Sequence, residues 1–178
     1  MSDSIEVCGE GSLSNSFLGD TVQVCVVSRD WKRTVDGFVK MGIGPWRVYT
    51  FGPDTVTDQT YMGKPQEYSM RLALATSGNM LWEVIQPLEG PSIYKDFLQK
   101  HGEGVQHVAQ SCQDKPFEQK LADFAAAGCP MIQSGTWQGV RYAYFGTDDK
   151  IATTVEIFDF PADFVFPEPD LWVPGPPS

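Results

Sequence analysis

The alternation of apolar and polar residues along the chain predicts a regular series of strands and helices. β-Branched and apolar runs favour strands, and apolar residues that recur every three or four positions favour helices. The expected strands are 21–27, 46–51, 67–76, 80–86, 105–112, 131–134, 139–145 and 153–160, and the expected helices are 30–41, 92–101 and 117–127, the last capped by Asp114. Residues 52–65 are polar and turn-rich, so we expect a long loop with a functional role.

The predicted elements follow the order β-α-β-β-β, a linker helix, and β-α-β-β-β again. QVCVVSRD, which begins at Gln23, corresponds to HVAQSCQD, which begins at His107, and each piece ends in the Asp before a helix. The last strands of the two halves also correspond, because Glu83 and Glu156 each stand in an apolar run that ends shortly before a proline. An internal duplication of this length predicts an α+β fold of two βαβββ modules in tandem.

Composition shifts divide the chain into five parts. The lead-in is rich in Ser and Gly, and the tail is so rich in proline that it can continue neither a helix nor a central strand. We expect the tail to lie over the body of the protein or to be disordered at its end. The parts are an irregular lead-in (1–20), a first module (21–90), a linker helix (91–103), a second module (104–161) and a Pro-rich tail (162–178).

Charge and cysteine usage narrow the class of protein. A chain of 178 residues with a formal charge of −10 is a poor binder of nucleic acid and of anionic membranes. It has no apolar run long enough to span a bilayer and no secretory leader, and none of its four cysteines forms a CxxC pair. Cys25 and Cys112 stand in apolar runs, where a thiol behaves as a small hydrophobe. We therefore expect a cytoplasmic protein whose partner is a small molecule.

Four polar side chains interrupt otherwise apolar strands: Gln23, Glu83, His107 and Glu156. A buried Glu is costly unless it is paired or bound to a cation. Three oxygen ligands and one imidazole suit a divalent ion such as Zn, Ni, Co, Mn or Mg, with positions left open for water or substrate. The alternative is a pocket without metal, in which hydrogen bonds satisfy each group separately.

These pieces resemble the vicinal oxygen chelate superfamily, which contains glyoxalases, methylmalonyl-CoA epimerases, extradiol dioxygenases and bleomycin-resistance proteins. The stretches that carry the resemblance are QVCVVSRD, GNMLWEVIQPL, SIYKDFLQKHGEGVQHVAQSCQD and TTVEIFDFP. The resemblance implies that the two modules form a cup of curled mixed sheet around one divalent metal. It also implies that Gln23, Glu83, His107 and Glu156 are the metal ligands, and it suggests a homodimer.

The details of the resemblance point to two branches of the superfamily. The Gln-Glu-His-Glu set is similar to that of the zinc-type glyoxalases, whereas the sequence around it is similar to the epimerases. Val27 replaces the arginine with which those glyoxalases bind glutathione, which argues against a glutathione substrate. A dioxygenase site would need two histidines, but His101 is expected to be exposed at the end of the linker helix.

Both branches imply a proton abstracted from the carbon beside a carbonyl, with a metal as Lewis acid. The resemblance makes Glu156 the base and Glu67 a second candidate acid or base. The expected substrate-binding aromatic residues are Trp46, Tyr49, Tyr68, Trp82, Tyr142 and Tyr144. The function predicted is therefore a metal-dependent isomerase, epimerase or lyase. The alternative is a metal-free protein of the same fold that only binds a small molecule.

Overall fold

The computed structural model describes residues 17–112 and 115–177. The expected cap Asp114 and most of the expected lead-in lie outside these residues. The elements in chain order are β1 (Thr21–Val27), α1 (Trp31–Lys40), β2 (Trp46–Phe51), β3 (Val56–Tyr61), β4 (Lys64–Pro65), β5 (Met70–Ser77), β6 (Met80–Pro87), α2 (Ile93–Lys100), β7 (Gly104–Ser111), α3 (Phe117–Ala126), β8 (Met131–Trp137), β9 (Val140–Phe145), α4 (Asp148–Ile151), β10 (Thr154–Asp159) and β11 (Leu171–Val173). No helix in these residues is both long and apolar enough to cross a bilayer.

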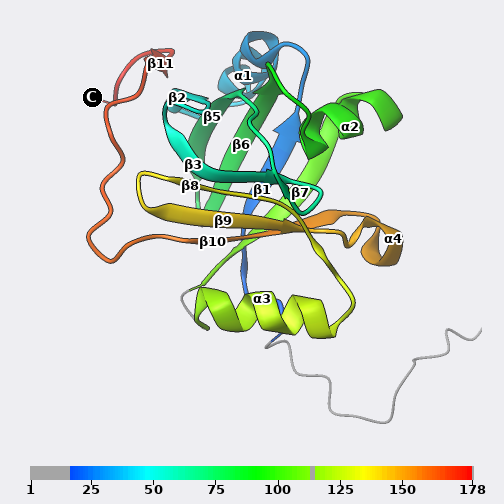
Figure 1. Cartoon of the computed structure of the whole chain (residues 1–178). Helices are drawn as coiled ribbons and strands as arrows, with labels where there is room; N and C mark the ends of the chain where they lie inside the picture. Colours follow the sequence, from blue (N-terminus) through cyan, green and yellow to red (C-terminus); the bar gives the residue numbers. More distant parts are fainter. Residues whose placement is uncertain (1–16, 113–114, 178) are drawn as a thin grey trace, which may run out of the picture.

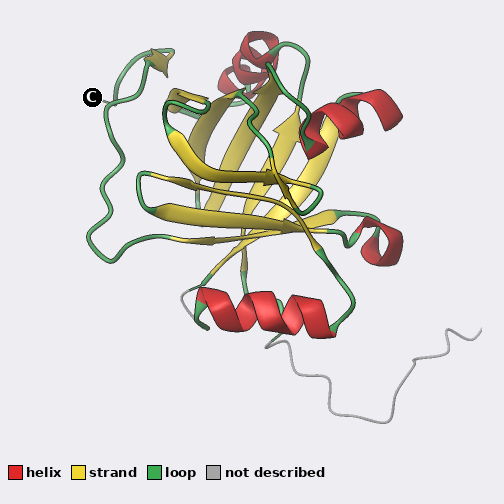
Figure 2. Ribbon diagram, in the orientation of Figure 1, coloured by secondary structure: helices red, strands yellow, loops and turns green. Residues whose placement is uncertain are grey.

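The strands form one mixed sheet that curls into a half-barrel cup, with the helices packed around it (Figures 1 and 2). The strand order is β11-β2-β5-β6-β1-β7-β10-β9-β8-β3-β4. The first and last strands of each module lie at the centre, since β1 pairs in parallel with β6 and β7 pairs in parallel with β10. The two modules join where β1 pairs antiparallel with β7. This architecture confirms the predicted α+β class and the tandem βαβββ arrangement.

Two helices cover the outer faces of the sheet. The Asp30 carboxylate caps α1 by accepting a hydrogen bond from the Arg33 backbone N–H, as its position before the helix predicted. The apolar face of α1 packs on the outer side of the first module, around Val35 and Trp46. Helix α3 packs in the same way on the second module, where Phe124 stacks on Phe145 with ring centroids 3.8 Å apart. The inner face of the cup is thereby left for the main core and the site.

The prediction of a long loop at residues 52–65 is wrong, because most of this segment forms the hairpin of β3 and β4. β3 pairs antiparallel with β8 of the second module, although β2, just before it in the chain, lies near the other edge of the sheet. The turn after Phe51 therefore carries the chain across the open side of the cup. The Phe51 ring stacks on Trp137 with centroids 4.7 Å apart at this junction. The strand looks like a loop in sequence because two of its six side chains, Thr57 and Asp58, are exposed and polar.

The C-terminal tail lies over the body of the protein, as one of the two sequence expectations stated. It leaves the end of β10, runs outside the cup and adds β11 to the edge strand β2 (Figure 1, orange to red). The Tyr49 hydroxyl donates a hydrogen bond of 3.0 Å to the carbonyl of Pro167. The Asp170 carboxylate accepts from the Thr50 hydroxyl at 2.7 Å and pairs with Arg71 at 3.2 Å. These contacts fix the tail across the mouth of the first module.

Candidate metal centre and its cavity

The four central strands bring the predicted ligands to one place inside the cup. Gln23 lies on β1, Glu83 on β6, His107 on β7 and Glu156 on β10, and all four are buried. Successive side chains of a strand point to opposite faces, so each of these residues reaches the inner face while its two neighbours point away. The duplicated sequence thus produces a site with one ligand candidate from each of four adjacent strands.

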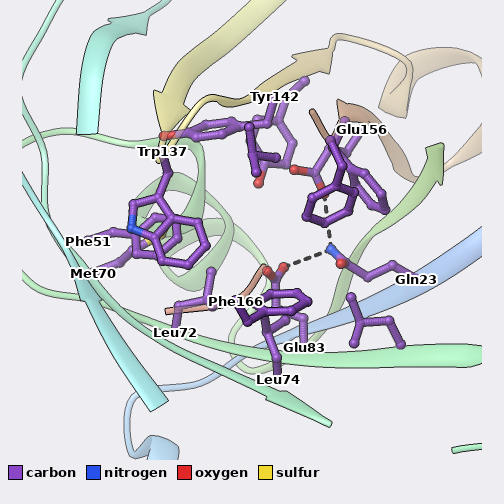
Figure 3. A pocket seen from close by; sticks show the side chains of 15 residues that line it. Gln23, Phe51, Met70, Leu72, Leu74, Glu83, Trp137, Tyr142, Glu156 and Phe166 are labelled. Carbon is purple, nitrogen blue, oxygen red and sulfur yellow. Dashed lines mark hydrogen bonds between the residues drawn. The ribbon is translucent and has the colours of Figure 1, made fainter. Parts of the chain in front are cut away.

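The four side chains converge inside the cup, and Figure 3 shows Gln23 reaching both Glu83 and Glu156. The Gln23 amide nitrogen lies 3.2 Å from Glu83 Oε2 and 3.1 Å from Glu156 Oε2. His107 Nε2 lies 3.1 Å from each of the same two oxygens. Two carboxylates therefore flank one imidazole and one carboxamide in a space closed to solvent.

Gln106 fixes the orientation of the His107 ring. Its Oε1 lies 2.5 Å from His107 Nδ1, and its amide nitrogen donates to the Thr154 hydroxyl at 3.3 Å. A carbonyl oxygen can only accept, so the Nδ1 atom must carry the proton in this contact. Nε2 is thereby turned toward the carboxylates, where it makes no well-directed hydrogen bond. In the neutral ring its lone pair faces two anionic oxygens.

The electrostatics of the site favour a cation between these groups. Burial lowers the pKa of His107, but the two carboxylates of Glu156 and Glu83 beside its Nε2 atom outweigh burial and raise the pKa to about 9. Burial raises the pKa of Glu156, and the charge of Glu83 adds to this effect. The site therefore holds a positive charge on His107, or takes an ion in its place.

The residues fit a divalent metal ion on chemical grounds. The buried Nε2 atom lacks a good partner, two carboxylates stand beside it, and Gln23 can present its oxygen once the amide is turned. A histidine whose other nitrogen is held by an oxygen acceptor is the usual arrangement for a metal ligand. The donor set of imidazole, carboxylate and amide suits a borderline or hard divalent ion.

Cys25 also belongs to the site, which the sequence reasoning missed. It was predicted to act as a small hydrophobe, yet its Sγ, a Glu83 oxygen and a His107 nitrogen all lie within 4.8 Å of one another. Cys25 stands opposite both residues in the sheet, on β6 and on β7. Burial, followed by the charge and hydrogen bond of Glu83, raises the pKa of its thiol. The available signal was its position two residues after Gln23, on the same face of β1.

Tyrosine hydroxyls extend the polar site into the core. Tyr94 donates to the Tyr144 hydroxyl at 2.8 Å, and Tyr144 hydrogen-bonds Glu156. Tyr68 and Tyr142 share a hydrogen bond of 2.9 Å between their hydroxyls. Gly135 makes room for this pair, because a Cβ at that position would collide with the Tyr142 hydroxyl. Burial raises the pKa of all four tyrosines, which keeps them neutral as hydrogen-bond donors.

A small cavity of about 60 Å³ opens beside these groups (Figure 3). Gln23, Glu83 and Glu156 form part of its wall, together with Tyr142 and Tyr144. The other lining residues are apolar: Phe51, Met70, Leu72, Leu74, Leu81, Trp137, Val140, Phe158, Phe160 and Phe166. The arrangement can hold a few substrate atoms against one or two carboxylates and keep bulk water away.

Several residues expected at the site lie elsewhere. Trp46 and Trp82 pack under α1 on the outer face of the sheet. Tyr49 and Tyr68 belong to the inner core but do not line the cavity. Glu67 is exposed ahead of β5 and does not line the cavity either. His101 is exposed, as expected.

Comparison with known families supports the architecture. A family model described as "Glyoxalase/Bleomycin resistance protein/Dioxygenase superfamily" matches residues 22–145. No curated protein sequence matches the chain.

Solved structures with the same fold have low sequence identity to this chain. A hypothetical protein from Bacillus halodurans C-125 is 17% identical, with a TM-score of 0.62 over 83% of this chain and 98% of the other. Methylmalonyl-CoA epimerase from Mycobacterium tuberculosis is 15% identical, with a TM-score of 0.58 over 83% of this chain and 91% of its own. A Streptomyces coelicolor methylmalonyl-CoA epimerase variant in complex with 2-nitronate-propionyl-CoA is 18% identical, with a TM-score of 0.56 over 82% and 99%. At these identities the likeness establishes a shared fold.

Proposed function

Because the chain belongs to the glyoxalase/bleomycin resistance protein/dioxygenase superfamily, we propose that it is a divalent-metal-dependent isomerase, epimerase or lyase. Its reaction would remove a proton from a carbon next to a carbonyl group of a small molecule. The observation that carries this proposal is the buried His107 Nε2, which lies 3.1 Å from a carboxylate oxygen of both Glu83 and Glu156 and makes no well-directed hydrogen bond.

The metal would be held by Gln23, Glu83, His107 and Glu156, with the Cys25 thiol beside them. A bound divalent ion supplies a Lewis acid that stabilises negative charge on a substrate oxygen. Zn, Ni, Co, Mn and Mg all remain candidates, since amide, imidazole and carboxylate donors serve each of them.

Glu156 is the residue to which we assign proton abstraction. It lines the cavity, and burial raises its pKa, which brings a carboxylate closer to the range of an effective base. The hydrogen bond from Tyr144 holds the carboxylate in position, and Tyr94 holds Tyr144 in turn. We assign no acid–base role to Glu67, since its exposed side chain lies outside the cavity.

We also propose that the protein is cytoplasmic and forms a homodimer. Reduced thiols at Cys25 and Cys129 suit a cytoplasmic protein, and a homodimer is consistent with the superfamily resemblance. The epimerase structures that share the fold bind acyl-CoA compounds, so a thioester is the first substrate class to compare.

The decisive experiment is elemental analysis of the protein purified without added metal or chelator, together with Gln23→Ala, Glu83→Gln and Glu156→Ala. We expect close to one divalent ion per chain in the wild type and loss of the ion in the variants. Glu89→Gln is the matched control, because Glu89 is an exposed carboxylate just after the same strand as Glu83. Circular dichroism confirms that each variant is folded.

A wild type that takes up no Zn, Ni, Co, Mn or Mg would overturn the proposal. The four side chains would then serve a metal-free protein that binds a small molecule through its apolar cavity. Retention of the metal in Glu83→Gln and Glu156→Ala would also contradict the assignment, because it would place the ion elsewhere.

A further inference from the structure

The cavity beside the candidate metal centre adjoins a second, larger space. This outer groove has a volume of about 640 Å³ and is lined by the β5–β6 turn, the end of β7 and the start of the tail. Four side chains line both spaces: Leu81, Phe158, Phe160 and Phe166. They form the partition between the inner cavity and the groove through which a ligand would enter. Two of them, Phe160 and Phe166, follow the last strand of the second module.

The tail is positioned so that Phe166 stays in this partition. The Arg47 guanidinium contacts both the Phe166 and Trp172 rings, at 5.0 and 5.2 Å from their centroids. Trp172 lies on β11, which is hydrogen-bonded to β2 opposite Arg47. The Phe160 and Phe166 rings also pack together, with centroids 5.9 Å apart. Figure 3 shows Phe166 among the side chains that surround the cavity.

The size of the inner cavity limits what can reach the carboxylates. A cavity needs roughly 10–15 Å³ to hold one water molecule, and an apolar cavity that binds benzene measures about 150 Å³. The cavity of about 60 Å³ therefore has room for only a few non-hydrogen atoms. A coenzyme A thioester would have to pass its long pantetheine arm between the side chains that line both spaces, including Phe160 and Phe166.

We propose that Phe160 and Phe166 determine substrate size, so that the enzyme acts on short-chain carbonyl compounds with two neighbouring oxygens and a small apolar substituent, and not on acyl-CoA thioesters. The inference rests on the proposed function, because the oxygens would bind at the metal centre. The apolar wall favours an uncharged substituent, and the partition restricts that substituent to the size of a methyl or ethyl group.

The first test compares two metal chelators on zinc-loaded protein by isothermal titration calorimetry. Acetohydroxamate carries a methyl group and benzohydroxamate carries a phenyl ring beside the same chelating atoms. We expect the wild type to prefer acetohydroxamate by about tenfold or more, since a misfit of one or more methylenes has effects of this size. Phe166→Ala should abolish or reverse the preference, and Phe166→Leu should reduce it. Methylmalonyl-CoA should not bind the wild type.

Phe164→Ala is the matched control. Phe164 lies in the same tail and packs on Phe160 and Phe166, with centroids 4.9 and 5.0 Å apart, but it does not line the cavity. This variant should keep the wild-type preference. Benzohydroxamate binding the wild type as tightly as acetohydroxamate, an unchanged preference in Phe166→Ala, or tight binding of methylmalonyl-CoA would each overturn the inference.

A second test needs no metal and so separates this inference from the proposed function. Benzene is titrated into the metal-free proteins, and binding is followed by NMR. It should bind Phe166→Ala, where the lost ring enlarges the cavity, but not the wild type or Phe164→Ala. Benzene binding to the wild type would overturn the size limit even if the metal is present. A protein without metal that shows the expected benzene pattern would refute the proposed function and retain the size limit.

Discussion

Gln106 does not line the cavity, but it contacts and orients the His107 side chain of the candidate metal centre. Its Oε1 accepts from His107 Nδ1 and so directs Nε2 toward Glu83 and Glu156. Gln106→Ala should lower metal affinity about 10- to 100-fold, because outer partners of metal-binding histidines have effects of this size. Competition with a chromophoric chelator measures the change.

Gln110→Ala is the control for this prediction. Gln110 is a buried glutamine on the same strand, β7, so its removal makes a similar void. It should leave metal affinity close to that of the wild type. Equal losses in the two variants would show that packing in β7, and not the orientation of His107, governs the affinity.

Glu103 makes a separate contribution to the pH dependence of stability. Its carboxylate accepts hydrogen bonds from the Arg33 side chain at 2.7 and 2.6 Å, from the Arg29 backbone N–H at 2.8 Å and from the Ser28 hydroxyl at 2.9 Å. These bonds, with that of Arg33 the strongest, lower the pKa of Glu103 to about 2. A lowered folded-state pKa stabilises the protein above the unfolded pKa and loses that effect as pH falls through the folded one.

Replacing Glu103 with Gln should therefore reduce stability at neutral pH. The difference from the wild type should stay constant above about pH 5 and shrink as pH falls from about 4.5 toward 2. Added salt should reduce it, since Arg33 is largely exposed. Urea unfolding at several pH values measures the effect, with Glu89→Gln as the control. A difference that persists unchanged at pH 2 would refute this account.

Trp46 packs between helix α1 and the sheet, on the outer face of the first module. Trp46 is fully buried, its indole N–H donates to the Ile43 carbonyl at 2.8 Å, and Phe38 packs against it. Trp46→Ala should lower the free energy of unfolding by about 3–5 kcal/mol, as expected for a large buried aromatic residue. Metal content and ligand preference of the folded fraction should be unchanged. A change in ligand preference without loss of stability would contradict this prediction and indicate that Trp46 belongs to the candidate site.

The elements that could be predicted from the sequence are those with a local pattern. The elements that were missed pair with strands far away in the chain. The duplicated strands around Gln23 and His107 carry a period of two and a shared polar position, so their inward face was predictable. Because successive side chains of a strand alternate, the sequence also indicates that Trp82 and Glu83 point to opposite faces. Trp82 was nevertheless expected at the site, because aromatic residues are abundant on these strands. The strand β3 was missed because its partner β8 lies far away in the chain, and two of its six side chains are exposed and polar. Partners of this kind cannot be read from a single segment.

The whole molecule should unfold in one cooperative step, although its sequence is duplicated. β1 and β7 pair across the centre, β3 of the first module pairs with β8 of the second, and one inner core contains residues of both, such as Ile85 and Tyr144. Neither module can lose its structure without exposing the other. Calorimetric and van't Hoff enthalpies should agree, and fluorescence and circular dichroism should give the same midpoint.

Two destabilising variants make this prediction specific, because they act in different modules. Trp46→Ala removes a core side chain from the first module, and Val155→Ala removes one from the second, where Val155 is fully buried. In a single cooperative unit each variant shifts the one transition as a whole, by an amount that follows its own loss of packing. If the modules were independent, each variant would lower only part of the transition and leave the rest at the wild-type midpoint. Site-specific hydrogen exchange distinguishes the cases, since amides of β2 and β9 should respond together to either change.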